Sequence, residues 1–124
     1  DLLQYLLAVD RQNPVLAKYS PITHPALLKV IDRVVAAARA ADIPLSCCGE
    51  MASRPLGVMI LVGLGLRSLS LPPSELALIR TFLRRSELSV FEGLAQKALT
   101  LSHAGAIEEM LTGHYQDWKA AQRR

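Results

Sequence analysis

The chain has 124 residues, 51% of them apolar and 20% charged, and carries a formal net charge of +3 at pH 7. This length and composition fit one domain with a buried core, and the basic residues are scattered without interleaved aromatic residues, which argues against a nucleic-acid partner. The longest uncharged apolar run, residues 55–66, is far shorter than the roughly 20 residues that a bilayer span requires, so we expect no membrane segment.

The beginning of the chain indicates a piece of a longer protein. It opens on Asp1, with neither an initiator methionine nor a charged-then-apolar signal pattern. The stretch DLLQYLLAV, residues 1–9, is expected to be the remnant of a strand.

Residues 25–41 are predicted to form a surface helix. Apolar residues recur there at steps of three and four, and the charged residues fall mostly off that stripe. Thr23 is the expected N-cap, and Pro25 suits the first turn. The stripe consists of Leu27, Leu28, Ile31, Val34, Val35 and Ala38.

The middle of the chain alternates between strand and helix patterns. IPLSCC, residues 43–48, is typical of a buried strand, and the segment 53–65, with Ser53 as its cap, predicts a helix buried on most sides. RSLSL, residues 67–71, predicts a second strand, and residues 74–86 a second amphipathic helix. This alternation predicts parallel strands joined by helical crossovers, as in doubly wound sheets and (β/α)8 barrels. The expected inward residues of the second helix are Leu76, Ile79, Phe82 and Leu83.

The last third of the chain is predicted to be helical. Ser89 and Glu92 have the spacing of a capping box, and Gly105 separates their helix from a final one. The inward face of that final helix is expected to carry Ile107, Met110, Leu111, His114 and Trp118.

Two or three parallel strands would leave the edges of their sheet unpaired. We therefore expect the chain as a whole to be the C-terminal part of a larger barrel.

Both cysteines of the chain, Cys47 and Cys48, are adjacent. A disulfide between neighbours would strain the eight-membered ring, so we expect free thiols and a reducing, cytoplasmic location. The three histidines, His24, His103 and His114, lie far away in sequence and form no ligand pattern with the thiols, which argues against zinc. Each histidine is expected to be a cap or a surface residue.

Two long motifs carry a resemblance to a known family. The stretches DLLQYLLAVDRQN and CCGEMASRPLGVMILVGLGLRSLSLPPSEL, in this order, resemble the C-terminal end of the phosphoenolpyruvate-binding barrel of phosphoenolpyruvate-protein phosphotransferase, enzyme I of the bacterial phosphotransferase system. The stretch 67–70, Arg-Ser-Leu-Ser, is more similar to the nitrogen-related paralogue. The matching residues are Asp1, Leu2, Gln4, Tyr5, Leu7, Ala8, Asp10, Arg11, Cys48, Gly49 and Glu50.

The resemblance implies an α/β fold, namely the C-terminal portion of a (β/α)8 TIM barrel with extra C-terminal helices. Residues 1–86 would be the barrel part, and residues 87–124 a helical extension of the same domain. Pyruvate phosphate dikinase and phosphoenolpyruvate synthase are similar through the same barrel, and a barrel of their type is an alternative.

The resemblance also assigns roles to individual residues. Asp1 would bind Mg²⁺ and, through it, the substrate phosphoenolpyruvate, while Arg11 would hold the phosphate. Cys48 would protonate the enolate carbon as pyruvate forms, because a thiol of ordinary pKa is mostly protonated at neutral pH. Gly49 and Glu50 would lie beside these groups, with Glu50 either orienting the site or serving as a structural hydrogen-bond acceptor. Cys47 would point the other way by strand alternation and pack.

The family's reaction passes the phosphoryl group of phosphoenolpyruvate to a histidine on a separate domain and then to a phosphocarrier protein. None of the histidines of this chain fits that role, so the fragment alone is expected to be inactive. The resemblance also implies that the whole protein is a homodimer. The alternative is a non-catalytic dimerisation or regulatory module. One departure bears on this choice, since the family usually has Gly-Asp where this chain has Ser53-Arg54, so that a cation replaces an anion. Arg54 would either strengthen a site for an anionic substrate or mark a paralogue whose activity has drifted toward regulation.

Overall fold

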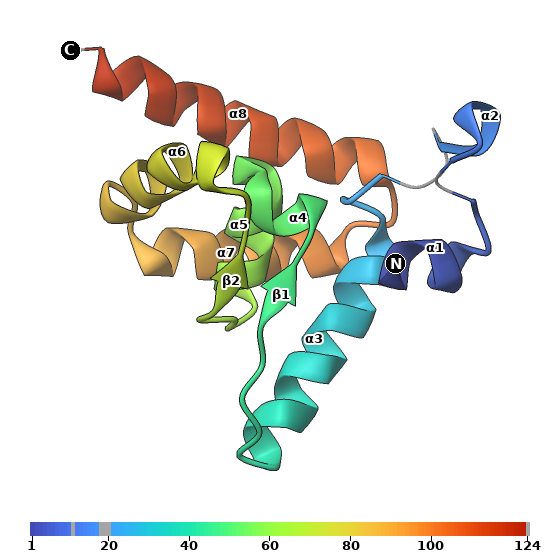
Figure 1. Ribbon diagram of the computed structural model, residues 1–124. Coiled ribbons are helices and arrows are strands. Elements are labelled where there is room, and N and C mark those ends of the chain that lie inside the picture. The colour runs from blue at the N-terminus through green and yellow to red at the C-terminus, as the bar shows by residue number, and fades with distance from the viewer. Residues whose placement is uncertain (11, 18–20, 124) are drawn as a thin grey trace.

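The computed structural model describes residues 1–10, 12–17 and 21–123. Within them, helices alternate with two very short strands and then continue alone to the C-terminus (Figure 1). The elements are α1 (Leu2–Leu7), α2 (Pro14–Ala17), α3 (Pro25–Ala40), β1 (Cys47–Cys48), α4 (Glu50–Ser53), α5 (Pro55–Gly63), β2 (Leu69–Ser70), α6 (Pro73–Arg84), α7 (Leu88–Thr100) and α8 (Ala104–Gln122).

The two strands pair in parallel, as the alternating pattern predicts. Cys47 lies opposite Leu69 and Cys48 opposite Ser70, and α4 and α5 form the crossover between the strands. Both strands are shorter than predicted, because ladder pairing in the described residues is limited to these two positions on each strand. The described part of the chain is therefore mostly helical, and the complete barrel is not visible in it.

The core is built around α5, which packs on α7, α4 and α8. Val58, Met59, Ile60 and Leu61 are all almost fully buried, as predicted for a helix that is apolar nearly all round. The backbone of α7 approaches α5 so closely that a Cβ on Gly63 would lie 2.2 Å from the carbonyl oxygen of Phe91. Glycine at this position is thus a packing requirement.

The C-terminal helices close the core with aromatic side chains. Phe82 of α6 contacts Phe91 of α7 at 5.3 Å between ring centroids, and it meets Tyr115 and Trp118 of α8 edge-on at 5.4 and 4.9 Å. Aromatic pairs at these separations contribute roughly 0.5–1.5 kcal/mol each beyond the area that they bury. The C-terminal helices and α6 therefore share one apolar cluster.

The prediction of a strand over residues 1–9 is wrong, because Leu2–Leu7 form helix α1 and Ala8 ends it in the left-handed conformation at φ 52°. Leu3 and Leu7, four residues apart, are its half-buried leucines, and α1 packs on α3. Leucine favours helices, whereas strands prefer β-branched residues, and this stretch lacks them up to Val9.

Three predicted helix caps are also wrong. The N-cap of α3 is His24, whose Nδ1 accepts a hydrogen bond from the Ala26 N–H at 3.2 Å, because Pro25 occupies the first helical position. Ser53 belongs to α4, where its hydroxyl donates to the Glu50 carbonyl, so Arg54 is the N-cap of α5. Helix α7 starts at Leu88, which leaves Ser89 inside the first turn.

Two predicted inward side chains are exposed. Leu76 of α6 is 43% exposed, although Ile79 and Phe82 of the same helix are buried, and Val34 of α3 is 44% exposed. The inward face of α8 is as predicted, with Ile107 and Leu111 fully buried. Among the residues that the structure describes, no helix is both long enough and apolar enough to cross a bilayer.

Candidate active site

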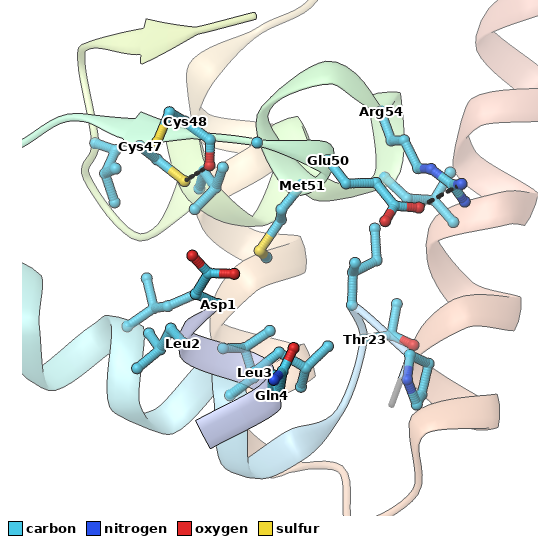
Figure 2. A pocket seen from close by; sticks show the side chains of 18 of the residues that line it. Asp1, Leu2, Leu3, Gln4, Thr23, Cys47, Cys48, Glu50, Met51 and Arg54 are labelled. Carbon is cyan, nitrogen blue, oxygen red and sulfur yellow. Dashed lines mark hydrogen bonds and ion pairs between the residues drawn. The ribbon is translucent and has the colours of Figure 1, made fainter. Parts of the chain in front are cut away.

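A cavity of about 920 Å³ opens where α1 and α3 face the end of β1 and helix α4 (Figure 2). Apolar side chains from α3 and α5 form much of its wall. Its polar and sulfur-bearing lining residues include Asp1, Gln4, Thr23, Ser46, Cys47, Cys48, Glu50, Met51, Arg54 and Glu108.

Cys48 is the last residue of β1 and is exposed. The carboxyl ends of parallel strands are where barrel enzymes carry their reactive groups. The following residue, Gly49, has φ 97° and ψ −166°, a conformation that is essentially restricted to glycine. Nothing lies within 4 Å of a Cβ built on Gly49, so backbone conformation, not lack of space, calls for glycine. Cys48 and Gly49 both belong to the lining of the cavity.

Cys47 has a different environment from its neighbour. It is half-buried, packs against the core and lines the same cavity. Its thiol donates to the Cys48 carbonyl oxygen at 3.6 Å. Burial raises the pKa of Cys47, and the adjacent Cys48 raises it further, so Cys47 stays protonated at neutral pH. Cys47 packs against the core, as expected. Strand alternation predicted that Cys47 would point away from Cys48, so its place on the same cavity as Cys48 was not predicted.

Asp1 precedes α1, and its carboxylate is turned toward the β1 side of the cavity (Figure 2). A carboxylate is a suitable ligand for Mg²⁺, which uses one or two protein carboxylates and fills its other positions with water and substrate phosphate oxygens. The described residues contain no group of three His, Cys, Asp or Glu side chains placed to hold a metal. Asp1 is thus a carboxylate of the kind that Mg²⁺ binds, but the described residues do not assemble a ligand set around it.

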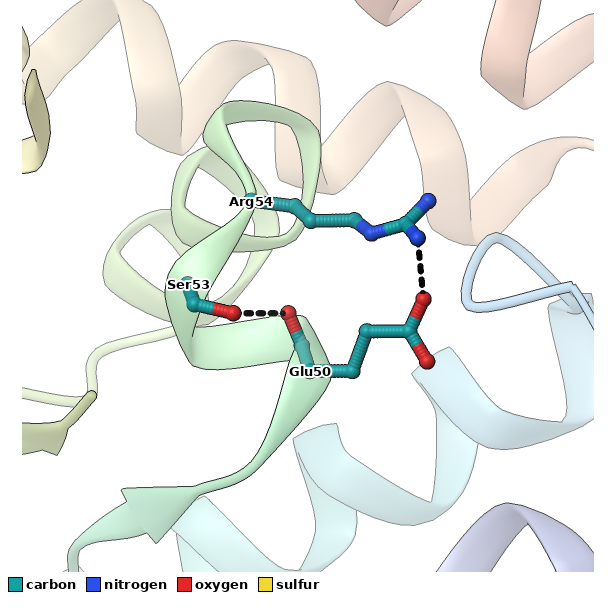
Figure 3. Close-up of polar contacts among 3 residues, drawn as sticks. All are labelled: Glu50, Ser53 and Arg54. Atoms are coloured by element: carbon teal, nitrogen blue, oxygen red, sulfur yellow. Dashed lines mark hydrogen bonds and ion pairs between the residues drawn. The ribbon is translucent and has the colours of Figure 1, made fainter. Parts of the chain in front are cut away.

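Glu50 and Arg54 form an ion pair across one turn beside Gly49, and the Ser53 hydroxyl donates to the Glu50 carbonyl oxygen at 3.0 Å (Figure 3). The two charged side chains are each 62% exposed. Their spacing of four residues is the signal that could have revealed the pair in the sequence. The loop beside the thiol thus carries a paired cation and anion.

The three histidines fall outside this site. Arg11 lies outside the described residues. His24 caps α3, His103 precedes α8, and the half-buried His114 meets Phe91 edge-on at 6.4 Å between ring centroids. None of these histidines lines the cavity.

Two lining residues were missed in the sequence. Thr23 is only 3% exposed, and its hydroxyl has no hydrogen-bond partner among the described residues. Met51 follows Glu50 in α4, and Figure 2 shows its thioether directed into the cavity. No sequence pattern distinguishes either residue from an ordinary core position.

Comparison with known families identifies a family that matches most of the chain. Residues 1–88 match the family described as PEP-utilising enzyme, PEP-binding domain. The chain belongs to this family. The matched segment includes both strands and every residue proposed for the site, from Asp1 to Glu50.

Three similar proteins extend the comparison beyond residue 88. The chain is 44% identical over 107 residues to a multiphosphoryl transfer protein of Rhodobacter capsulatus, covering 86% of this chain and 13% of that protein. It is 39% identical over 112 residues to the phosphoenolpyruvate-protein phosphotransferase of Mycoplasma pneumoniae, covering 90% and 19%. It is 42% identical over 111 residues to a phosphoenolpyruvate-dependent phosphotransferase system protein of Escherichia coli K12, covering 90% and 15%. The chain thus spans less than a fifth of the length of these relatives.

Proposed function

We propose that this chain is the C-terminal part of the phosphoenolpyruvate-binding barrel of a phosphoenolpyruvate-protein phosphotransferase. The whole protein would transfer the phosphoryl group of phosphoenolpyruvate to a histidine on another domain, release pyruvate, and pass the phosphoryl group on to a phosphocarrier protein. The observation that carries the proposal is the exposed Cys48 thiol at the carboxyl end of β1, on the same cavity as Asp1.

The reaction needs an acid that protonates a carbon atom of the substrate, as well as a group that accepts the phosphoryl group. When the bond between the phosphorus and the enol oxygen breaks, the histidine nitrogen takes the phosphoryl group and the enolate of pyruvate remains. Cys48 would donate its proton to the methylene carbon of that enolate, and the resulting thiolate would regain a proton from water. A positioned general acid of this kind contributes roughly 10²- to 10⁴-fold to a rate.

The negative charge of the substrate needs positive partners. Asp1 would hold Mg²⁺ together with ligands from outside this chain, and Arg11 would hold the phosphate. The ion, when bound, would offset charge on the phosphoryl oxygens. Arg54 is the cation among the described lining residues, and it is already paired with Glu50.

Finer features belong to the same proposal. The stretch Arg67–Ser70 supports the nitrogen-related paralogue over the one dedicated to sugar transport, and the whole protein would be a homodimer. The extension after residue 86 would belong to the same domain, since α5 packs on α7. The free thiols fit a reducing, cytoplasmic compartment.

The test uses the full-length protein with phosphoenolpyruvate and Mg²⁺, measuring pyruvate release against phosphate bound to histidine. The proposal predicts one pyruvate released for each histidine phosphorylated, and onward transfer when a phosphocarrier protein is added. A folded full-length protein that leaves phosphoenolpyruvate unchanged would instead favour a second candidate, a non-catalytic dimerisation or regulatory module. The Arg54 substitution beside Gly49 and Glu50 is the observation that favours that candidate.

A further inference from the structure

Cys47 and Cys48 carry adjacent thiols, and the proposed reaction uses only that of Cys48. Both are free, and both line the same cavity at the end of β1. Cys47 is held in place by the core, whereas Cys48 is exposed. The pair therefore combines one anchored sulfur with one accessible sulfur.

A direct bond between these two sulfurs is disfavoured by geometry. Consecutive Cα atoms are about 3.8 Å apart, whereas the Cα atoms of a disulfide usually lie about 4.4–6.8 Å apart. An atom inserted between the two sulfurs removes this requirement, because each sulfur then bonds to the bridging atom and not to the other sulfur. The pair thus resists oxidation to a disulfide while it keeps the ability to chelate.

We propose that Cys47 and Cys48 form a dithiol site for trivalent arsenic compounds. With an organic arsenoxide, both S–H bonds and the arsenic–oxygen bond break, two As–S bonds form, and the oxygen leaves with the two protons as water. The arsenic remains trivalent, so the step needs neither an oxidant nor a reductant. The organic group keeps the third arsenic valence.

The space around Cys48 permits this closure. Strand β1 ends at Cys48, and the next residue, Gly49, has no side chain and open space where a Cβ would stand. The exposed Cys48 side chain can therefore rotate toward Cys47 without meeting a neighbour at Gly49. Cys47 already contacts the Cys48 peptide through its 3.6 Å hydrogen bond to the carbonyl oxygen.

The ligand count favours arsenic over a metal ion. Structural zinc requires four ligands, and the described residues supply no third His, Cys, Asp or Glu side chain grouped with these thiols. A monosubstituted trivalent arsenic atom requires two sulfurs, which is the number present here. Because the site consists of the two thiols alone, it does not depend on the reaction proposed for the cavity.

The test treats the full-length protein with phenylarsine oxide and measures the mass of the intact protein. Wild type should gain one phenylarsenic group, with loss of one water, that survives excess monothiol and is released by a dithiol such as 2,3-dimercaptopropanol. Cys47→Ser and Cys48→Ser should each lose this monothiol-resistant adduct, and peptide mapping of wild type should place the arsenic on residues 47–48.

Circular dichroism spectra matching wild type would show that the two serine variants are folded. The proposal is overturned if wild type loses the arsenic to excess monothiol. It is also overturned if either folded variant keeps the resistant adduct, because the arsenic would then be held by other thiols of the full-length protein.

Discussion

Asp1 and Cys48 line one cavity, although Asp1 precedes the first helix and Cys48 ends the first strand (Figure 2). Asp1 reaches this cavity from the start of α1 and Cys48 from the end of β1. The proposed enolate chemistry requires both residues on one cavity.

Asp1→Asn should raise the Mg²⁺ concentration needed for half-maximal pyruvate release by the full-length protein. The amide removes the negative charge that makes a carboxylate a good magnesium ligand, while it keeps the size of the side chain. A Mg²⁺ titration at fixed phosphoenolpyruvate measures the effect. Asp117→Asn, on an exposed position of α8 outside the cavity, is the matched control and should leave the titration unchanged. An unchanged titration for Asp1→Asn would remove Asp1 from the magnesium site.

Gly49→Ala should destabilise the protein by about 1–3 kcal/mol, because the new side chain must adopt a backbone conformation essentially reserved for glycine. Gly93→Ala is the control, since Gly93 lies inside α7 with open space around it and alanine favours helices there. That variant should be stabilised by up to about 1 kcal/mol. Urea denaturation of both variants measures the difference. Equal effects in the two variants would show that the Gly49 turn carries no conformational cost.

Glu50→Gln should lower the free energy of unfolding by less than about 1 kcal/mol, because the pair with Arg54 is mostly exposed and screened by solvent. The effect should shrink further at high salt. Denaturation at low and high ionic strength tests both statements. A larger loss that is insensitive to salt would mean that Glu50 has a buried partner outside this chain.

Residues 1–124 expressed alone should self-associate. In the described residues β1 and β2 pair only with each other, and several large apolar side chains are exposed, among them Tyr5 at 79% and Ile43 at 61%. Light scattering over a range of concentrations should show an increasing average mass. A monodisperse monomer at every concentration would contradict the expectation.

The sequence correctly predicted helices where the apolar pattern and a proline in the first turn both indicate a helix. Helix α3 starts at Pro25, as predicted, α5 lies within the helix predicted over residues 53–65, and the parallel pairing of the strands follows from the crossover pattern. Residues 1–9 were mispredicted as a strand although leucine favours helices and the stretch has no β-branched residue before Val9; they form α1, which packs on α3.

The candidate site was predictable only in part. The position of Cys48 follows from the strand end, but the shared cavity of Cys47 and Cys48 depends on how a two-residue strand meets the Gly49 turn. The buried hydroxyl of Thr23 could not be foreseen, because Pro25 moved the cap of α3 to His24. Such features arise from tertiary contacts that no local pattern encodes.

The most direct test of the account is isotope exchange between pyruvate and phosphoenolpyruvate by the full-length protein. Exchange requires a proton to leave and return at the methyl carbon of pyruvate, which is the step assigned to Cys48. Cys48→Ser should reduce exchange by roughly 10²-fold or more, because a hydroxyl is a far weaker acid than a thiol. Cys47→Ser, one residue away, should reduce it by a much smaller factor. Exchange at the wild-type rate in a folded Cys48→Ser variant would contradict the account.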